Sequence, residues 1–167
     1  MSTTPDILCI GSVLWDIIGR SDHAMLAGND KPGRIRRIPG GVALNIAMQL
    51  RHEAMHPELL SVVGDDAEGR ALLAACVGMG LGVRHMLIDR DLPTDHYMAV
   101  EAQGQLIAAI ADAHSLETAG ARILEPLEDG RLASPGAPWT GLIALDGNLT
   151  TALLGEIAEN PVFAQAD

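Results

Sequence analysis

The sequence contains few aromatic and few basic residues. Its 167 residues include one Phe, one Tyr and two Trp, and its 11 Lys and Arg are outnumbered by 22 Asp and Glu, which gives a net charge of −11 with histidine neutral. Nucleic-acid binding generally needs basic side chains to neutralise phosphates and aromatic side chains on which bases stack. We therefore expect that nucleic acid is not a partner of this chain.

Long hydrophobic runs are missing as well, although 48% of the residues are hydrophobic. No run approaches the roughly 18 to 20 residues that a membrane-spanning helix needs. The N-terminal sequence MSTTPD lacks the basic start of a signal peptide. We expect one globular domain that is cytoplasmic and has no membrane partner.

Cysteine is scarce. Cys9 and Cys76 are the two cysteines, and each lies in an apolar run far from the other. In a reducing compartment such residues are expected as buried free thiols. A disulfide is therefore not expected to hold this fold together.

Short apolar segments alternate with segments of helical periodicity along the chain. This alternation is typical of α/β folds with a largely parallel sheet. The expected helices are residues 43–51, 67–77, 117–124 and 150–158. The expected extended segments are residues 7–11, 59–63, 83–88, 97–100, 106–110 and 141–146, with a further strand beginning at 161–163. Residues 101–105 have the composition of a hairpin turn, so the strands on either side are predicted to form a β-ribbon.

Two motifs resemble well-known sites but fail in their context. His52-Glu53-Ala54-Met55-His56 fits the zinc motif H-E-x-x-H, which needs both histidines on one helix face. Pro57 disfavours helical geometry at His56, so we expect no metal here. Residues 28–35 resemble a phosphate-binding loop, but Arg34 and Ile35 replace its lysine and hydroxyl residue, so this segment is not such a loop.

Polar residues at predicted turns and strand ends are the better candidates for a site. Ionised aspartates only accept hydrogen bonds, and each can accept from two adjacent hydroxyls, as recognition of a cis-diol requires. A pair of glycines lets a ligand approach the backbone at a helix N-terminus. Taken singly, Asp146 could instead cap a turn and Asn45 could be an exposed helix residue. The candidates are Asp16, Gly40, Gly41, Asn45, Asp112 and Asp146.

Several of these residues lie in segments that resemble the PfkB, or ribokinase-like, family of carbohydrate kinases. The matching segments, in the family's order and spacing, are residues 10–16 (IGSVLWD), 39–47 (PGGVALNIA), 62–69 (VVGDDAEG) and the turn at Thr94. The G-G-x-x-x-N element followed by V-G-x-D-x-x-G is the most specific part. Residues 31–35 (KPGRI) and 107–112 (IAAIAD) look more like pseudouridine kinases than ribokinases.

The resemblance implies a ribokinase-like three-layer α/β core with a largely parallel sheet and a small β-lid. The lid would be built from residues 17–38 and 95–111, and its exposed apolar surface would pair with a second copy to form a homodimer. Asp16 would hold ribose hydroxyls, and Gly40, Gly41 and Asn45 would line the sugar pocket. Asp146 would add a second carboxylate, and Thr94 and Asp112 would lie on or near the lid.

The resemblance also implies what the chain lacks. The family's catalytic aspartate lies in a late G-A-G-D element whose backbone amides hold the transferred phosphate, and this element does not occur in the 167 residues. The complete family enzyme uses ATP and Mg, so the resemblance places the donor site outside this chain. Phosphoryl transfer needs both positioning and charge stabilisation. We therefore expect residues 1–167 to be the N-terminal portion of one domain, with no catalytic residue and little or no kinase activity alone.

The function implied for the complete protein is ATP-dependent phosphoryl transfer to a primary hydroxyl of a sugar or nucleoside, with pseudouridine among the candidates. A second interpretation is a non-catalytic sugar-binding or dimerisation module that keeps the acceptor half and the lid. A zinc hydrolase built on His52 and His56 is the third, and metal analysis would eliminate it.

Overall fold

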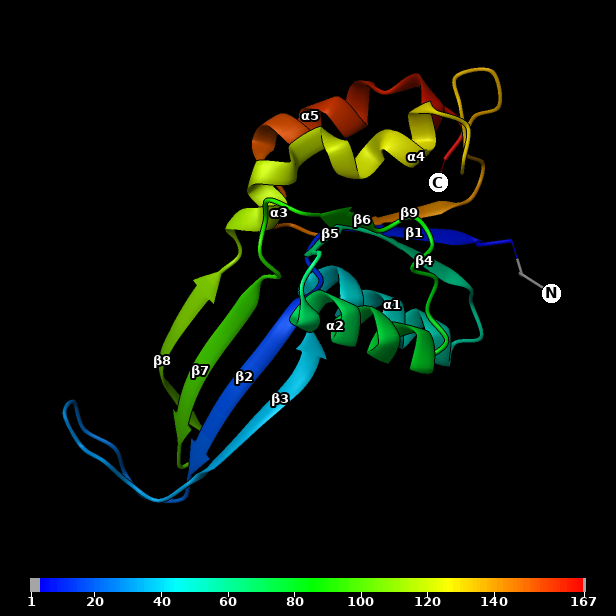
Figure 1. Ribbon diagram of the computed structural model, residues 1–167. Coiled ribbons are helices and arrows are strands. Elements are labelled where there is room, and N and C mark those ends of the chain that lie inside the picture. The colour runs from blue at the N-terminus through cyan, green and yellow to red at the C-terminus, as the bar shows by residue number, and fades with distance from the viewer. Residues whose placement is uncertain (1–3, 167) are drawn as a thin grey trace.

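Three parallel strands form the centre of the fold. The computed structural model describes residues 4–166, and its central sheet has the order β4-β1-β9 (Figure 1). Strand β1 pairs in parallel with both of its neighbours. The bounds are Ile7–Ile10 for β1, Pro57–Leu60 for β4 and Leu142–Leu145 for β9. The predicted α/β class with a parallel sheet is therefore confirmed.

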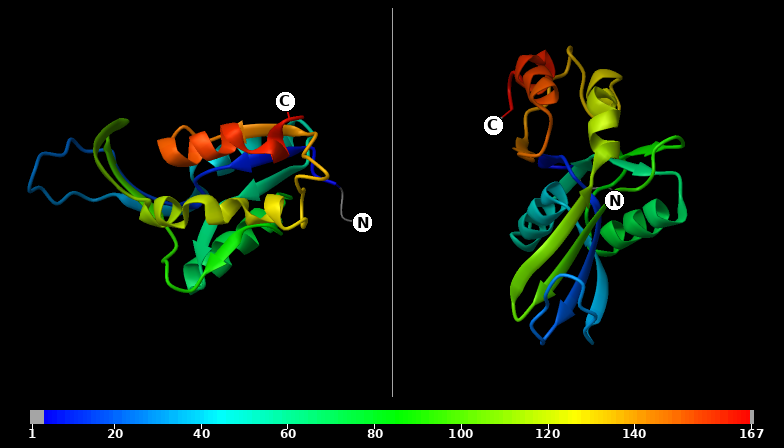
Figure 2. Two further views of the ribbon diagram at one scale, coloured as in Figure 1. Left: turned by 90° about the horizontal axis from the view of Figure 1, so that it is seen from above. Right: turned by 90° about the vertical axis from the view of Figure 1, so that its left-hand side faces the viewer.

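Helices cover both faces of this sheet, so the core has three layers (Figures 1 and 2). On one face lie α1 and α2, which span Val42–His52 and Ala67–Gly78. On the other face lie α3 (His114–Ala119), the short 3-10 helix η1 (Gly120–Leu124), α4 (Glu125–Glu128) and α5 (Thr151–Glu159). Within residues 4–166, none of the helices combines the length and the apolar character needed to span a membrane.

The side chains of β1 alternate between the two helical layers. Leu8 and Ile10 belong to the apolar cluster formed with α3, η1, α4 and α5, and both are fully buried. Ile7 and Cys9 belong to the cluster formed with α1 and α2. A strand that is buried on both faces is expected to be continuously apolar, as this one is. Cys9 is a free thiol, and burial raises its pKa to about 12, so it remains protonated.

A second sheet, which we call the lid sheet, projects from one end of the core (Figure 1). Its strand order is β3-β2-β7-β8. The outer pairs are antiparallel, whereas β2 and β7 in the middle run parallel. The bounds are Leu14–Ser21 for β2, Arg34–Gly40 for β3, His96–Ala102 for β7 and Gln105–Asp112 for β8. The predicted ribbon around residues 101–105 is the hairpin of β7 and β8.

The base of the lid sheet is anchored to α2 through Trp15. The Trp15 indole Nε1 donates a hydrogen bond to the backbone oxygen of Glu68, 3.0 Å away. The guanidinium of Arg37 lies 4.2 Å from the centre of the Trp15 ring, which is close enough for a cation–π interaction, and Arg37 also pairs with the Glu68 carboxylate. These contacts fix the direction in which the lid sheet leaves the core.

Some predicted elements differ from the structure. Residues 59–63 form parts of two strands rather than one, because the chain changes partner at Ser61. Strand β4 pairs with β1, whereas β5 (Val62–Gly64) pairs in parallel with β6 (Leu87–Asp89). Of the extended segment predicted at 83–88, only its last two residues lie in β6.

Two further predictions near the second helical layer need correction. The strand expected to begin at residues 161–163 is the 3-10 helix η2 (Pro161–Phe163). Asn160 causes this turn, because its side-chain oxygen accepts a hydrogen bond from the Val162 N–H at 3.0 Å. The helix predicted at 117–124 begins earlier, at His114, and continues as η1 from Gly120.

The start of α2 is held by Asp66, its N-cap residue. The Asp66 carboxylate accepts hydrogen bonds from the Gly69 N–H at 2.6 Å, the Thr94 N–H at 3.0 Å and the Thr94 hydroxyl at 2.8 Å. Burial alone would raise the pKa of Asp66, but these hydrogen bonds outweigh it and lower the pKa. The cap therefore joins α2 to the segment that leads into β7.

We predict that Asp66→Ala lowers the stability of the chain by about 1 to 2 kcal/mol, since an N-cap and its partners are lost. This corresponds to a fall in Tm of roughly 2 to 8 °C for a domain of this size. Folding lowers the pKa of Asp66. The stability difference between the wild type and Asp66→Ala should therefore be complete above the ordinary aspartate pKa of about 3.9. It should disappear as the pH falls through the lower pKa of the folded state. Thermal denaturation at neutral and acidic pH measures both effects.

Asp65→Ala is the matched control, because Asp65 is exposed and its carboxylate pairs with the exposed Arg70 at 3.1 Å. Such a surface pair contributes at most about 1 kcal/mol. Equal losses of stability in the two variants near neutral pH would contradict the role assigned to Asp66.

Candidate functional site

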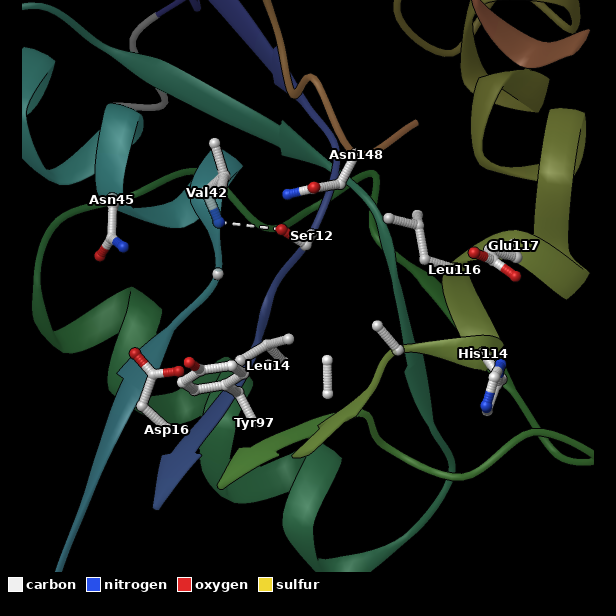
Figure 3. Close-up of a pocket in the computed structure, with 13 residues that line it drawn as sticks. Ser12, Leu14, Asp16, Val42, Asn45, Tyr97, His114, Leu116, Glu117 and Asn148 are labelled. Atoms are coloured by element: carbon white, nitrogen blue, oxygen red, sulfur yellow. Dashed lines mark hydrogen bonds between the residues drawn. The ribbon is translucent and has the colours of Figure 1, made fainter. Parts of the chain in front are cut away.

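A cavity of about 480 Å³ opens where the lid sheet meets the core (Figure 3). Its walls come from the segment after β1, the start of α1, the lid strands β2, β7 and β8, helix α3 and the loop after β9. This is the edge at which β1 and β9 end, where open α/β sheets bind ligands. The lining residues are Ser12, Leu14, Asp16, Gly41, Val42, Asn45, Tyr97, Ala111, Ala113, His114, Leu116, Glu117 and Asn148.

Asp16 supplies a partly buried carboxylate from β2. In the lid sheet it lies opposite Ile38 of β3 and Tyr97 of β7. Gly40 leaves room for it, since a Cβ atom at Gly40 would lie 2.1 Å from Asp16 Oδ2. Burial raises the pKa of the Asp16 carboxyl, because the charged form loses part of its hydration.

Helix α1 starts against Ser12. The Ser12 hydroxyl accepts a hydrogen bond from the Val42 N–H at 2.8 Å, and the Ser12 backbone oxygen accepts one from Leu44 at 3.3 Å. Gly41, just before the helix, has a φ of 99° that L-residues rarely adopt, and a Cβ there would lie 2.4 Å from the Ser12 oxygen. Asn45, one turn into the helix, is thereby placed on the cavity wall.

The part of the lining around Asp16 is largely apolar and comes from the lid sheet and α3, and we call it the apolar wall. Tyr97 and Ala111 are paired residues of β7 and β8, and Leu116 belongs to α3. Asp95 fixes the start of α3, because its buried carboxylate accepts hydrogen bonds from the N–H groups of Ser115 and Leu116 at 3.0 and 3.2 Å. A cavity that combines an apolar wall with polar side chains pointing into it is typical of a small-molecule site.

The structure brings three of the predicted site residues together at the cavity, namely Asp16, Gly41 and Asn45. Gly40 is adjacent and makes space for the Asp16 side chain. The carboxylate and the carboxamide face the same space and can accept and donate hydrogen bonds to a hydroxylated ligand.

The other three predicted residues are outside the lining set found among residues 4–166. Thr94 is 3% exposed and its hydroxyl is bound to Asp66 and to the Gly64 N–H. Asp112 lies between the lining residues Ala111 and Ala113, and the alternation of strand β8 turns it to the other face of the lid sheet. Asp146 is 0% exposed and accepts hydrogen bonds from Ser12.

Five polar lining residues were not predicted from the sequence. Ser12 lies within the segment 10–16, Asn148 lies two residues after the candidate Asp146, and Tyr97, the single tyrosine, lies in a predicted strand. His114 and Glu117 come from the first turn of α3, which was placed too late in the chain. The polar residues at strand ends were visible in the sequence, but their side-chain partners were not.

The H-E-x-x-H segment does not form a helical metal site. Helix α1 ends at His52, and His56 lies just before β4 with its Nδ1 atom 3.4 Å from Asp6 Oδ2. The prediction that the two histidines do not share a helical turn is therefore confirmed. In the part of the chain from residue 4 to 166, no three metal-binding side chains come together.

Residues 4–129 match the pfkB family of carbohydrate kinases, and the chain belongs to that family. One relative is the pseudouridine kinase of Escherichia coli K12, which is 34% identical over 107 residues. A second is the uncharacterised sugar kinase YeiI of the same organism, 31% identical over 159 residues, a match that covers 92% of this chain.

Solved structures show the same architecture. A carbohydrate kinase from Agrobacterium tumefaciens superposes with a TM-score of 0.73 over 94% of this chain at 23% identity. Ribokinase from Arabidopsis thaliana, solved with ribose and ATP, gives a TM-score of 0.67 over 98% of the chain at 18% identity. The predicted ribokinase-like fold is confirmed.

The chain spans only part of these proteins. The matches cover 64% of this chain and 34% of the pseudouridine kinase, and 42% of YeiI. Each of the two solved structures is covered over 51% of its length. The core and the lid sheet described above therefore correspond to about half of the fold of these solved structures.

We predict that Gly41→Ala destabilises the chain more than Gly28→Ala does. Both glycines have a positive φ, 99° and 82°, but a Cβ at Gly28 would meet nothing within 4 Å. The backbone conformation alone should lower the Tm of Gly28→Ala by roughly 2 to 8 °C. Gly41→Ala also forces Ser12 away from the start of α1, so its Tm should fall at least about twice as far. Equal melting temperatures for the two variants would contradict this reading of the Gly41 contact.

Proposed function

We propose that this chain carries the acceptor-binding site of an ATP-dependent sugar or nucleoside kinase, with pseudouridine as the first candidate ligand. The observation that carries the proposal is the partly buried Asp16 carboxylate on the cavity wall beside Asn45. Membership of the pfkB family and the similarity to a pseudouridine kinase support it.

The site binds a ribose ring through two polar side chains and the apolar wall. The Asp16 carboxylate accepts hydrogen bonds from two neighbouring hydroxyls, and Asn45 can both donate and accept. Hydrogen bonds to a carboxylate contribute about 1.5 to 3 kcal/mol each, more than bonds between neutral groups. The apolar wall with Tyr97 and Leu14 packs against the C–H groups of the ring or against a base.

The donor side of the reaction belongs, in this proposal, to the part of the relatives that the chain does not span. ATP with Mg supplies the transferred phosphoryl group, and its transfer requires an oriented acceptor hydroxyl and stabilisation of the phosphate charge. Asp16 and Asn45 orient the acceptor, but the sequence has no G-A-G-D element for the phosphate. The chain alone therefore binds the acceptor without phosphorylating it.

The test is calorimetric titration of the chain and of its Asp16→Ala and Asp16→Asn variants with pseudouridine, ribose and adenosine. Loss of two charge-assisted hydrogen bonds should weaken binding of the preferred ligand at least roughly tenfold in both variants. Wild-type binding should also weaken as the pH falls, because protonation removes the acceptor. Because the pKa of Asp16 is raised, this loss of affinity should occur at a higher pH than that at which an ordinary aspartate is protonated. The Asp16→Asn variant should not show this pH dependence.

Thermal denaturation separates binding from folding in this experiment. Since burial penalises the charged form of Asp16, the Tm of Asp16→Asn near neutral pH should not fall below that of the wild type. Asp65→Asn, the same change at an exposed position, is the control and should bind normally. Addition of ATP and Mg to the wild-type titration should yield no phosphorylated product. Equal affinities of wild type and Asp16 variants would remove Asp16 from the site.

A second candidate function, pairing with another copy through the lid sheet, is favoured by its exposed apolar side chains. All eight residues of β8 are exposed, and Ile110 is 61% exposed. Ile35 of β3 is 80% exposed at the other edge of the sheet. Apolar side chains on an open sheet with free edges are typical of an association surface.

We predict that the chain is a dimer at micromolar concentration and that Ile110→Lys makes it a monomer, because a charge on the apolar lid surface opposes burial. Light scattering measures the mass. Val77→Lys is the matched control, since Val77 is 59% exposed on α2 and away from the lid sheet. A wild-type monomer, or equal dissociation of both variants, would contradict pairing through the lid.

A further inference from the structure

Asp146, at the end of β9, is a fully buried carboxylate with a complete set of partners. Its Oδ2 atom accepts hydrogen bonds from the Ser12 N–H at 2.9 Å and from the Ser12 hydroxyl. Its Oδ1 atom accepts one from the Asn148 N–H at 2.8 Å. The side chain is 0% exposed. Gly11 makes room for it, because a Cβ at Gly11 would lie 2.1 Å from the Cβ of Asp146.

This carboxylate reaches the cavity wall through Ser12. The Ser12 hydroxyl donates to Asp146 and at the same time accepts from the Val42 N–H at 2.8 Å. Asp146 thereby fixes the direction of the Ser12 hydroxyl, and the hydroxyl fixes the first turn of α1. Asn45, which lines the cavity, follows within that helix.

The same carboxylate also fixes the loop that carries Asn148. The bond from the Asn148 N–H to Asp146 closes a tight turn after β9. The Asn148 carboxamide lines the cavity and points toward Ser12 and Val42, across the cavity from Asp16 (Figure 3). It offers both a donor and an acceptor, whereas ionised Asp16 only accepts.

We propose that Asp146 is a positioning residue, and that Asn148 is the residue of this loop that contacts the ligand. The inference rests on the proposed function, because it concerns the same cavity. It revises the expectation of a second carboxylate in the pocket. A ligand hydroxyl could bind Asp146 only by displacing Ser12 or the Asn148 N–H, which would leave a buried polar group without a partner.

The test is a double-mutant cycle with pseudouridine as the titrated ligand. Asn148→Ala should weaken binding roughly fivefold to tenfold, as expected for one neutral hydrogen bond. Asp146→Asn replaces one acceptor oxygen by an N–H donor, and it should weaken binding by a similar factor because the loop that carries Asn148 is no longer held in place. If Asp146 acts through Asn148, the double variant should bind no more than about twofold more weakly than the weaker single variant.

Two outcomes of the cycle would overturn the proposal. One is an unchanged affinity in Asn148→Ala. The other is a double variant whose loss equals the product of the two single losses, since Asp146 would then contribute independently. Asp129→Asn, the same chemical change at an exposed residue outside the cavity, is the control and should bind like the wild type.

Hydrogen exchange of backbone amides in the ligand-free protein tests the positioning role without any ligand. Asp146→Asn should speed exchange of the Asn148 N–H at least roughly tenfold. Ser12→Ala should speed exchange of the Val42 N–H by a similar factor. The core amides of β1 should exchange at the wild-type rate in both variants. Unchanged exchange at Asn148 in Asp146→Asn would overturn the positioning role. If the wild type binds none of the three ligands, the proposed function fails, and the exchange rates still decide the role of Asp146.

Discussion

The burial of β1 on both faces is the constraint on which the rest of the structure depends. Leu8 and Ile10 are covered by one layer of helices, and their neighbours in the strand by the other. A strand that is paired at both edges and covered on both faces cannot slip by one residue without moving its side chains into the wrong layer. The end of β1 at Ile10 therefore fixes where the chain leaves the core, and so where Ser12 and Asp16 lie.

The cavity combines this rigid edge of the core with side chains from distant parts of the chain. Ser12 and Asp146 are 134 positions apart in sequence and meet because β1 and β9 are neighbours in the sheet. The apolar wall comes from the lid sheet, which is attached to the core by the same segment that carries Ser12. Ligand binding and lid position are thus linked through a short stretch of backbone.

Reasoning from the sequence succeeded where local pattern decides the outcome. The apolar run of β1 and the glycines before α1 each specify their structure through neighbours in sequence. Prediction failed where the structure of a segment depends on pairing with a strand that is distant in sequence. Residues 59–63 look like one strand, but β4 and β5 are separated at Ser61 because they pair with different strands.

In the candidate site, too, local sequence pattern identified some residues, whereas the roles of others depend on tertiary contacts. Asn45 could be placed because it follows a recognisable glycine turn, whereas Asp16 was expected at a turn after the first strand and lies within β2. The sequence indicated a carboxylate at position 146, but its role depends on whether its oxygens face the cavity or Ser12, which only tertiary contacts determine. Nothing in the sequence marked Asn148 as a ligand contact, because its place on the cavity wall depends on the fold of the loop after β9.

The parallel pairing of β2 and β7 has a consequence for the order of folding. Trp15 lies opposite His96 in this pair, so the middle of the lid sheet forms only after a long intervening chain has been closed into a loop. The entropy of closing that loop falls when α1, β4 and α2 have already folded between the two strands. The hairpins β2–β3 and β7–β8 can form early by themselves, since each joins strands that are adjacent in sequence. The lid sheet as a whole therefore assembles late, and it is the region where the native chain opens first without unfolding its core.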